Sequence, residues 1–379
     1  MYINYKNRIF GLDVIRATAI LLVLCSHSTL LLFPKKSNIF LTIIQFFGAI
    51  GVDLFFVLSG FLIGGILIKQ IDDNKIRLKD FFYFLSRRWF KTLPNYFLIL
   101  LLNIIVFYFF NKTVISGINR FFFFLHNFMY PMPDFFTESW SLSIEEFAYI
   151  LVPVLFIVSL FFFRSASNHK MFITVTITVI ISVFLGRLFF YFEHDVTSYK
   201  DWSSQIRKVV VYRIDSIYYG FLAAYIASKF RLVWNRYKGV AFTLGIIIFV
   251  VMHGVIFLLD IQPQTQPLFY IVFYLPILSI SLLLFFPVFS NWNEGTILKK
   301  GVTRISLLSY ALYLVNYSLV LRPIQNTFNI ETFSGEEKLA VLAFYWILSF
   351  FFAYILYVYF EKPIMNWRNS PLIRKYFLD

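Results

Sequence analysis

An arginine and a histidine lie eleven residues apart in an apolar segment near the start of the chain. Arg16 and His27 belong to GLDVIRATAILLVLCSHSTLLLF, which otherwise reads as membrane-spanning. Eleven residues are close to three helical turns, so both side chains should lie on one face of a helix, roughly 16 Å apart along its axis. Such groups are costly among lipid chains and usually line a cavity or a reaction path. An imidazole can also exchange a proton near neutral pH, so this pair is where chemistry is expected.

Other polar residues in apolar segments are predicted to share the depth of His27. They are Asp53, Glu145, Arg213, Asp215 and Asn316. One polar cavity opening outward explains a common depth. Arg213 and Asp215 are two positions apart and do not face each other on a helix, so each needs another partner. The structural alternatives are a core histidine at position 27 and outward-reaching side chains at Glu145 and Glu146.

A second, cationic cluster is predicted toward the inner side of the membrane. It consists of Arg16 in the first apolar segment and of Arg87, Arg88 and Lys91 before the third. Guanidinium and ammonium groups suit a phosphorylated ligand. The alternatives are an ion pair between Arg16 and Asp13, and a basic membrane anchor in the RRWFK run.

Composition places the chain among all-α, polytopic integral membrane proteins. It has 379 residues, of which 59% are hydrophobic and 14% charged, and its mean hydropathy is +0.74. The net charge of +14 is explained by basic loops facing anionic lipid headgroups, so membrane lipid is an expected partner and nucleic acid is not. The single cysteine, Cys25, excludes an intrachain disulfide and should point away from the face of His27, in a packing role.

About ten transmembrane helices are expected. The predicted spans are 10–33, 42–68, 92–110, 140–163, 171–192, 209–228, 239–259, 267–289, 303–321 and 339–360. With the N-terminus in the cytoplasm, 22 Lys and Arg residues fall inside and 9 outside, which predicts that both termini are cytoplasmic. The whole chain, 1–379, is predicted to be one transmembrane domain with no soluble extension. The basic, amphipathic segment 69–91 should lie on the membrane surface, and the run FFFFLHNF of the external segment 111–139 should dip into the interface.

Six motifs together resemble the membrane acyltransferase 3 family, in the order in which that family carries them. They are GLDVIRATAILLVLCSH (11–27), GVDLFFVLSGFLIG (51–64), SWSLSIEEFAYILVPVL (139–155), YRIDSIYYGFLAA (212–224), ISLLSYALYLVN (305–316) and FEKPI (360–364). The resemblance covers nearly the whole chain. It implies an O-acyltransferase of the bacterial cytoplasmic membrane that moves acetyl, or another acyl group, from acyl-CoA to a hydroxyl of a surface glycan. Typical acceptors are O-antigen, other surface polysaccharides and peptidoglycan, and no metal is expected.

The resemblance also implies roles for individual residues. His27 would be the catalytic base, oriented by Glu145 or Asp53, and the cluster of Arg16, Arg87, Arg88 and Lys91 would bind the donor. Residues expected to contact the acceptor are Trp140, with Tyr149 as the weaker candidate for stacking on a sugar, and Arg213, Asp215 and Asn316. Direct transfer is expected, with an acyl-enzyme on His27 or Ser59 as the alternative.

Two positions depart from the family pattern. Lys91 stands where the family usually has arginine and lacks the planar fork that binds phosphate. Asn316 stands where the family usually has histidine, and an amide cannot shuttle protons near neutral pH. Two other classes of function therefore remain open at this point: a transporter or flippase, and a catalytically idle paralogue that binds glycan.

Overall fold

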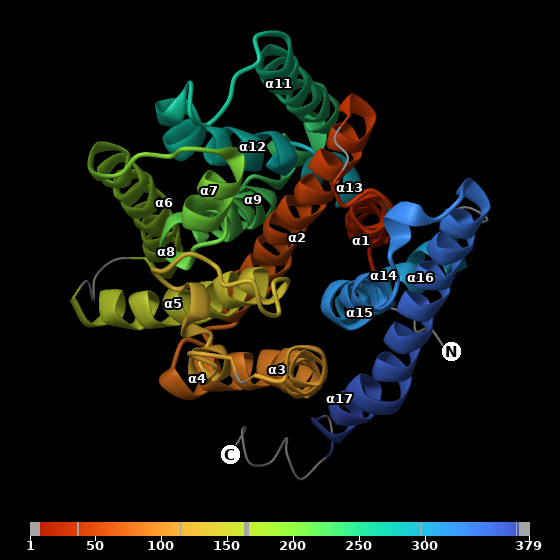
Figure 1. Ribbon diagram of the computed structural model, residues 1–379. Helices are drawn as coiled ribbons and strands as arrows, with labels where there is room; N and C mark the ends of the chain where they lie inside the picture. Colours follow the sequence, from red (N-terminus) through yellow and green to blue (C-terminus); the bar gives the residue numbers. More distant parts are fainter. Residues whose placement is uncertain are drawn as a thin grey trace.

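The computed structural model describes residues 8–35, 38–113, 115–162, 167–295, 298–368 and 370. These residues form helices joined by short connections, and no β-strand occurs among them (Figure 1). The all-α architecture predicted from the sequence is confirmed. The two ends of the chain, 1–7 and 371–379, which were predicted to be cytoplasmic, lie outside the described residues.

Ten helices of ten residues or more make up most of the fold. They are α1 (Phe10–Leu32), α2 (Ile39–Asp72), α3 (Leu78–Asn111), α5 (Ser139–Phe162), α6 (Asn168–Glu193), α9 (Asp215–Lys229), α11 (Lys238–Leu258), α12 (Tyr274–Leu283), α14 (Lys299–Val315) and α16 (Gly335–Ile355). The shorter α-helices are α4 (Asn119–Phe122), α7 (Tyr199–Trp202), α8 (Val210–Arg213), α10 (Arg231–Arg236), α13 (Phe286–Phe289), α15 (Arg322–Thr327) and α17 (Lys362–Arg368). Two segments, η1 (Leu125–Asn127) and η5 (Ile330–Thr332), are 3₁₀ turns. Four are π-helical: η2 (Ser203–Arg207), η3 (Phe269–Phe273), η4 (Asn316–Leu321) and η6 (Leu356–Glu361).

The predicted number of spans is confirmed. Among the described residues, nine helical stretches are long and apolar enough to cross a membrane, and a bent pair makes up to ten. The bent pair joins Tyr199–Arg207 to Val210–Lys229 at an angle of 93°, where the sequence had predicted one straight span over 209–228. Three π-helical segments, η3, η4 and η6, lie inside or at the start of long spans, as in Lys299–Thr327, where η4 connects α14 to α15. The fourth, η2, ends the first arm of the bent pair. π-Bulges are frequent at functional sites.

The segment 69–91, predicted to lie on the membrane surface, is not a separate element but is shared between the end of α2 and the start of α3. The helix α2 continues to Asp72, and α3 begins at Leu78 and runs without interruption to Asn111. The start of α3 is fixed locally, because the backbone N–H of Arg77 donates to the carboxylate of Asp80 at 2.9 Å. Capping of this kind satisfies a backbone donor that the first helical turn leaves unpaired. Arg88 and Lys91 therefore lie well inside a long helix rather than before it.

The segment between α3 and α5 folds against the helices instead of extending along them. Phe121, His126 and Asn127 are buried, and the rings of Phe121 and His126 stack at 4.1 Å. Asn127 donates to the carbonyls of Trp140 at 3.0 Å and Lys208 at 2.7 Å, so it joins this segment to α5 and to the break of the bent pair. The connection is therefore part of the protein core at this end of the bundle.

The helix α2 lies between α1 and α9 (Figure 1) and packs so closely on each that the backbones nearly touch. A Cβ at Gly60 would lie 2.0 Å from the carbonyl oxygen of Ile217, and one at Gly220 would lie 2.3 Å from that of Val57. A Cβ at Gly51 would similarly meet the carbonyl oxygen of Ala19 at 2.5 Å. Small residues allow this approach in membrane proteins, where van der Waals packing holds helices together. The result is a rigid frame for the side chains of α1, and α14 packs beside it.

Candidate active site

His27 is held by an amide. Its Nδ1 lies 2.5 Å from Oδ1 of Asn316. The amide orientation follows from its other contacts, because Nδ2 donates to the carbonyls of Leu312 at 2.6 Å and Tyr313 at 3.0 Å. Oδ1 must therefore be the atom that faces the imidazole, and Nδ1 of His27 must carry the proton. Nε2 is then the basic nitrogen, and none of the described residues makes a hydrogen bond to it.

The surroundings of this contact fix the imidazole further. Tyr345, which is fully buried, donates its hydroxyl to the same Oδ1 at 3.3 Å. The ring of Tyr317 lies 4.9 Å from that of His27, centroid to centroid. Asn316 and Tyr317 both belong to η4, so the π-helical segment supplies two of the contacts to His27. A half-buried imidazole with one nitrogen held and the other unpaired is the arrangement that a general base requires.

The carboxylates predicted to orient His27 lie elsewhere. Glu145 belongs to a cluster with Arg88, which donates to it at 2.8 Å, and Ser59, whose hydroxyl donates to it at 3.0 Å. Tyr149, the weaker candidate for sugar stacking, is also engaged here, because the Arg88 guanidinium lies 4.5 Å above its ring. The separation of Glu145 and Arg88 into outer and inner clusters is therefore wrong. The reason is the early start of α3, which brings Arg88 to the level of Glu145.

Asp53, Arg213 and Asp215 form buried ion pairs. Arg213 pairs with Asp53, and Asp215 pairs with Arg187 at 2.5 Å. Arg213 and Asp215 thus each have a partner other than their near neighbour, as the spacing predicts. Their side chains are almost fully buried and join α8 to α2 and α9 to α6. The structure therefore uses these charges to connect helices, rather than placing them around one cavity with His27.

Trp140 is accounted for by packing, whereas Cys25 is not. Trp140 is 4% exposed, and the Arg207 guanidinium lies 5.0 Å above its ring. The edge of Phe56 approaches the same ring at 5.6 Å. Cys25 stands two positions before His27 on α1 and so points to a different face, but it is exposed, and the predicted packing role is wrong. Stacking of Trp140 on a sugar stays a prediction that requires a change in this packing.

Arg16, a partly buried cation on α1, is only loosely engaged. Its one ion pair, to Asp13, is 3.9 Å long, and it makes no hydrogen bond to any described residue. The predicted Arg16–Asp13 pair exists, but Asp13 is bound more closely by Arg8 and by the hydroxyl of Ser306 at 2.7 Å. Arg88 and Lys91 lie within electrostatic range of Arg16. Arg16 therefore presents unused donors beside two other cations.

Lys91 and Arg87 have different surroundings. Lys91 lies within electrostatic range of Glu361, whose carboxylate accepts a hydrogen bond from Asn95 at 2.9 Å. Glu361 belongs to the FEKPI motif, so the structure connects that motif to the cationic cluster. Arg87 is exposed and donates to the hydroxyl of Tyr83 at 3.0 Å, on a different face of α3 from Arg88. The structure thus brings Arg16, Arg88 and Lys91 together and leaves Arg87 apart. Among the described residues, no group of three His, Cys, Asp or Glu side chains could hold a metal ion.

Three residues that contact the candidate site residues were not identified from the sequence. Arg187 was visible as a charge in an apolar run, and the unpaired Asp215 called for such a partner. Tyr345 gave no signal, because a tyrosine in an aromatic-rich span is unremarkable. Glu138 gave none either, because it stands outside the predicted spans. Its carboxylate accepts from the backbone N–H of Ser318 at 3.2 Å and from the Ser318 hydroxyl, so it anchors η4 two residues beyond Asn316.

Glu138 is expected to make the stability of the protein depend on pH. Burial raises the pKa of Glu138 to about 7, although its hydrogen bonds to Ser318 oppose the shift. The folded state then keeps a proton that the unfolded state loses, so this contribution is complete below about pH 4.5 and is lost as pH rises to about 7. The difference is about 3 kcal/mol. Glu138→Gln should therefore melt a few degrees above the wild type at pH 8 and close to it at pH 5.

Thermal unfolding of the detergent-solubilised protein at both pH values tests this expectation. Asp134→Asn, at an exposed carboxylate four residues away, is the matched control and should behave like the wild type at both. An equal gain for Glu138→Gln at pH 5 and pH 8 would contradict the assignment, because a pH-independent gain cannot come from titration of this group.

The fold and the site together define a class of protein. It is a polytopic membrane protein with a histidine held by an amide inside its helix bundle and a loosely paired arginine on the same helix. The chain belongs to the acyltransferase 3 family: the family model, described as an acyltransferase domain, matches residues 9–362.

Three relatives illustrate the similarity. The "Putative O-acetyltransferase SAR0937" of Staphylococcus aureus (strain MRSA252) is 26% identical over 97% of this chain and 61% of its own length. The "Peptidoglycan O-acetyltransferase OatA" of Listeria monocytogenes is 28% identical over 44% of this chain and 26% of its own length. The "Putative peptidoglycan O-acetyltransferase YrhL" of Bacillus subtilis (strain 168) is 30% identical over 44% of this chain and 26% of its own length. The chain thus spans less than two thirds of the length of these relatives. No solved structure matches it.

Proposed function

We propose that this protein is an O-acetyltransferase that moves acetyl from acetyl-CoA, or another acyl-CoA, to a hydroxyl of a surface glycan. The observation that carries the proposal is the fixed imidazole of His27, with Nδ1 bound to Asn316 and Nε2 free. Family membership supplies the acyl-transfer chemistry. The names of two relatives specify peptidoglycan, which makes it the first acceptor to test among surface polysaccharides and glycolipids.

In the proposed reaction, Nε2 of His27 takes the proton from the acceptor hydroxyl as its oxygen attacks the thioester carbonyl. The tetrahedral intermediate collapses with cleavage of the carbon–sulfur bond, and the CoA thiolate recovers the proton from the imidazolium. Asn316 keeps the ring in the required tautomer and orientation. No acyl-enzyme is needed. Ser59, the alternative nucleophile, donates to a carboxylate that Arg88 already binds, so it has no free base beside it.

The donor would enter from the side of the membrane where the basic residues concentrate. The 22-to-9 distribution of Lys and Arg favours a cytoplasmic location of that side, with the protein in the bacterial cytoplasmic membrane. Arg16 lies three helical turns from His27 on α1 and has free donors, so we assign it to the donor. Arg88 and Lys91 add positive charge nearby. Arg88 also forms an ion pair with Glu145, so replacing it would disturb that pair as well as any contact with the donor. Arg16 is therefore the better residue with which to test donor binding.

Arg16→Ala is expected to raise the KM for acetyl-CoA about tenfold, the effect of losing a charge-assisted contact, with normal protein abundance. Abundance should hold because Arg16 makes no hydrogen bond that its loss would break. Arg231→Ala, at an exposed cation without a described partner, is the control. Transfer of radiolabel from acetyl-CoA in proteoliposomes measures both. An unchanged KM in Arg16→Ala would remove this residue from the donor path.

The function itself is tested in cells. The gene is deleted and complemented, and ester-linked acetate is measured on purified peptidoglycan and on surface polysaccharide. Restoration of acetate on one of these glycans by the wild type identifies the acceptor. Acetate that never changes on either glycan would contradict the proposed acyl group or acceptor, and would favour transport of a glycan or an idle paralogue.

A further inference from the structure

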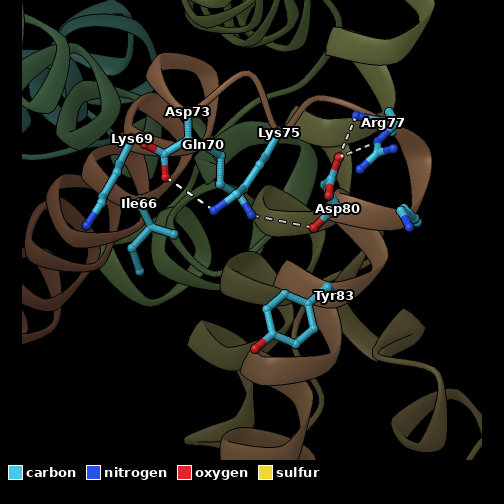
Figure 2. Close-up of a pocket in the computed structure, with 9 residues that line it drawn as sticks. Ile66, Lys69, Gln70, Asp73, Lys75, Arg77, Asp80 and Tyr83 are labelled. Carbon is cyan, nitrogen blue, oxygen red and sulfur yellow. Dashed lines mark hydrogen bonds and ion pairs between the residues drawn. The ribbon is translucent and has the colours of Figure 1, made fainter. Parts of the chain in front are cut away.

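A cavity of about 320 Å³ lies where α2 ends and α3 begins (Figure 2). This volume falls in the range of small-molecule sites, roughly 300–1,000 Å³. The connecting turn is held by backbone bonds, from the N–H of Asp73 to the carbonyl of Lys69 at 2.9 Å and from that of Lys75 to the carbonyl of Gln70 at 2.8 Å. The cavity is therefore built on a fixed turn between two long helices, and it is distinct from the region of His27.

The lining of the cavity has an excess of positive charge. Both carboxylates are already engaged: Asp80 caps α3 through Arg77, and Asp73 pairs with Lys75 at 3.4 Å. Lys69 and Lys79 also line the cavity, and neither has a partner among the described residues. Both are exposed. The charges of Lys75 and Arg77 are balanced by the two carboxylates, whereas the ammonium groups of Lys69 and Lys79 have no counter-charge. Such a pair of ammonium groups is suited to binding an anion.

Apolar and aromatic side chains in the cavity walls also bear on which ligand fits. Ile66 and the ring of Tyr83 add apolar and aromatic surface to a lining that also carries Lys69, Lys75 and Arg77 (Figure 2). Cations at a rim with an aromatic wall suit a phosphate joined to a planar ring better than a bare phosphate or a lipid headgroup. Tyr83 also lies five residues before Arg88 on α3, about 7.5 Å along the axis. The cavity therefore lies further along α3 than the cluster of Arg16, Arg88 and Lys91, on the face that Tyr83 shares with Arg87.

We propose that this cavity binds the nucleotide end of the acyl-CoA donor, with Lys69 and Lys79 holding its 3′-phosphate. The proposal rests on the proposed function, because it takes acyl-CoA as the donor. It adds a second anchor at the far end of the donor from the thioester. An acyl-CoA that lacks the 3′-phosphate should lose this anchor and keep the contact with Arg16.

Calorimetric titration of the detergent-solubilised protein with CoA and with 3′-dephospho-CoA tests the subsite without any turnover. The wild type should bind CoA about tenfold more tightly than 3′-dephospho-CoA. Lys69→Ala/Lys79→Ala should bind CoA about tenfold more weakly than the wild type, bind 3′-dephospho-CoA as the wild type does, and so lose the preference. The control, Lys238→Ala/Lys300→Ala, removes two exposed lysines without described partners and should keep the preference.

The other outcomes separate failure of the subsite from failure of the function. Equal binding of both ligands by the wild type, or a preference that survives in Lys69→Ala/Lys79→Ala, overturns the subsite and leaves the acyl-CoA donor standing. Failure of the wild type to bind either ligand overturns the donor, and the subsite with it. Binding to phosphatidylglycerol vesicles is measured as the last comparison. If the double variant loses only its binding to these vesicles, the cavity is a lipid site and the proposal is wrong.

Discussion

His27→Ala is expected to lower acyl transfer by about 100- to 10,000-fold, the contribution of a positioned general base. The imidazole is the group whose free nitrogen can accept the acceptor's proton, and alanine leaves that step to water. Membrane abundance should stay normal, because His27 is half-buried and its loss removes one hydrogen bond. Ester-linked acetate on the purified glycan, and transfer in proteoliposomes, measure the effect at a matched protein level.

His194→Ala is the matched control. His194 is exposed just after α6 and is engaged in stacking on Phe190 at 4.6 Å. Its loss should leave transfer unchanged. If His27→Ala keeps more than about a tenth of wild-type activity, the general-base role fails, because such a base contributes at least about 100-fold. An equal loss in both histidine variants would instead indicate general damage to the helix bundle.

Hydropathy and length predicted the fold well because a lipid bilayer imposes both. The predicted span 10–33 agrees with α1, and 140–163 agrees with α5, each within one residue at either end. The start of α3 was missed for a physical reason. Its first turns are basic and amphipathic, so hydropathy rises only near residue 92, whereas the helix begins with a polar cap at Arg77 and Asp80.

The polar residues of the site were easier to find than their partners. A charge in an apolar segment is visible in the sequence, and the spacing of Arg213 and Asp215 even required partners outside the motif. The partners themselves come from distant segments: Asp53 lies 160 positions from Arg213, and Asn316 lies 289 positions from His27. Neither separation leaves a trace in local periodicity, so the pairing could be seen only in three dimensions.

Asn316 is the clearest example of a residue whose position the sequence marked and whose contacts it did not reveal. The family resemblance marked the position, and the loss of histidine there suggested an idle protein. The structure shows another use for an amide, because Asn316 accepts from His27 and donates to two backbone carbonyls at the same time. A carboxylate could accept but could not donate, so aspartate would face the carbonyls of Leu312 and Tyr313 without a proton to offer.

Asn316→Ala is therefore expected to lower kcat by about 10- to 100-fold, because the imidazole loses the contact that fixes its tautomer and orientation. The KM for acetyl-CoA should stay within about twofold, since Asn316 lies at the His27 end of α1 and the assigned donor contact is Arg16. Transfer kinetics in proteoliposomes give both constants. Tyr345→Phe, which removes only the 3.3 Å bond to the same oxygen, is the mild control and should cost about threefold or less.

Asn316→His provides the sharper comparison. A neutral imidazole has one acceptor and one donor, so it can accept from Nδ1 of His27 and still donate to one of the two carbonyls. It should recover most of the activity that alanine loses, whereas Asn316→Asp should not, because a buried carboxylate leaves both carbonyls unpaired and adds a charge. Equal activity of the histidine and alanine variants would show that the amide acts through packing alone. Wild-type activity of Asn316→Ala would remove the residue from the site.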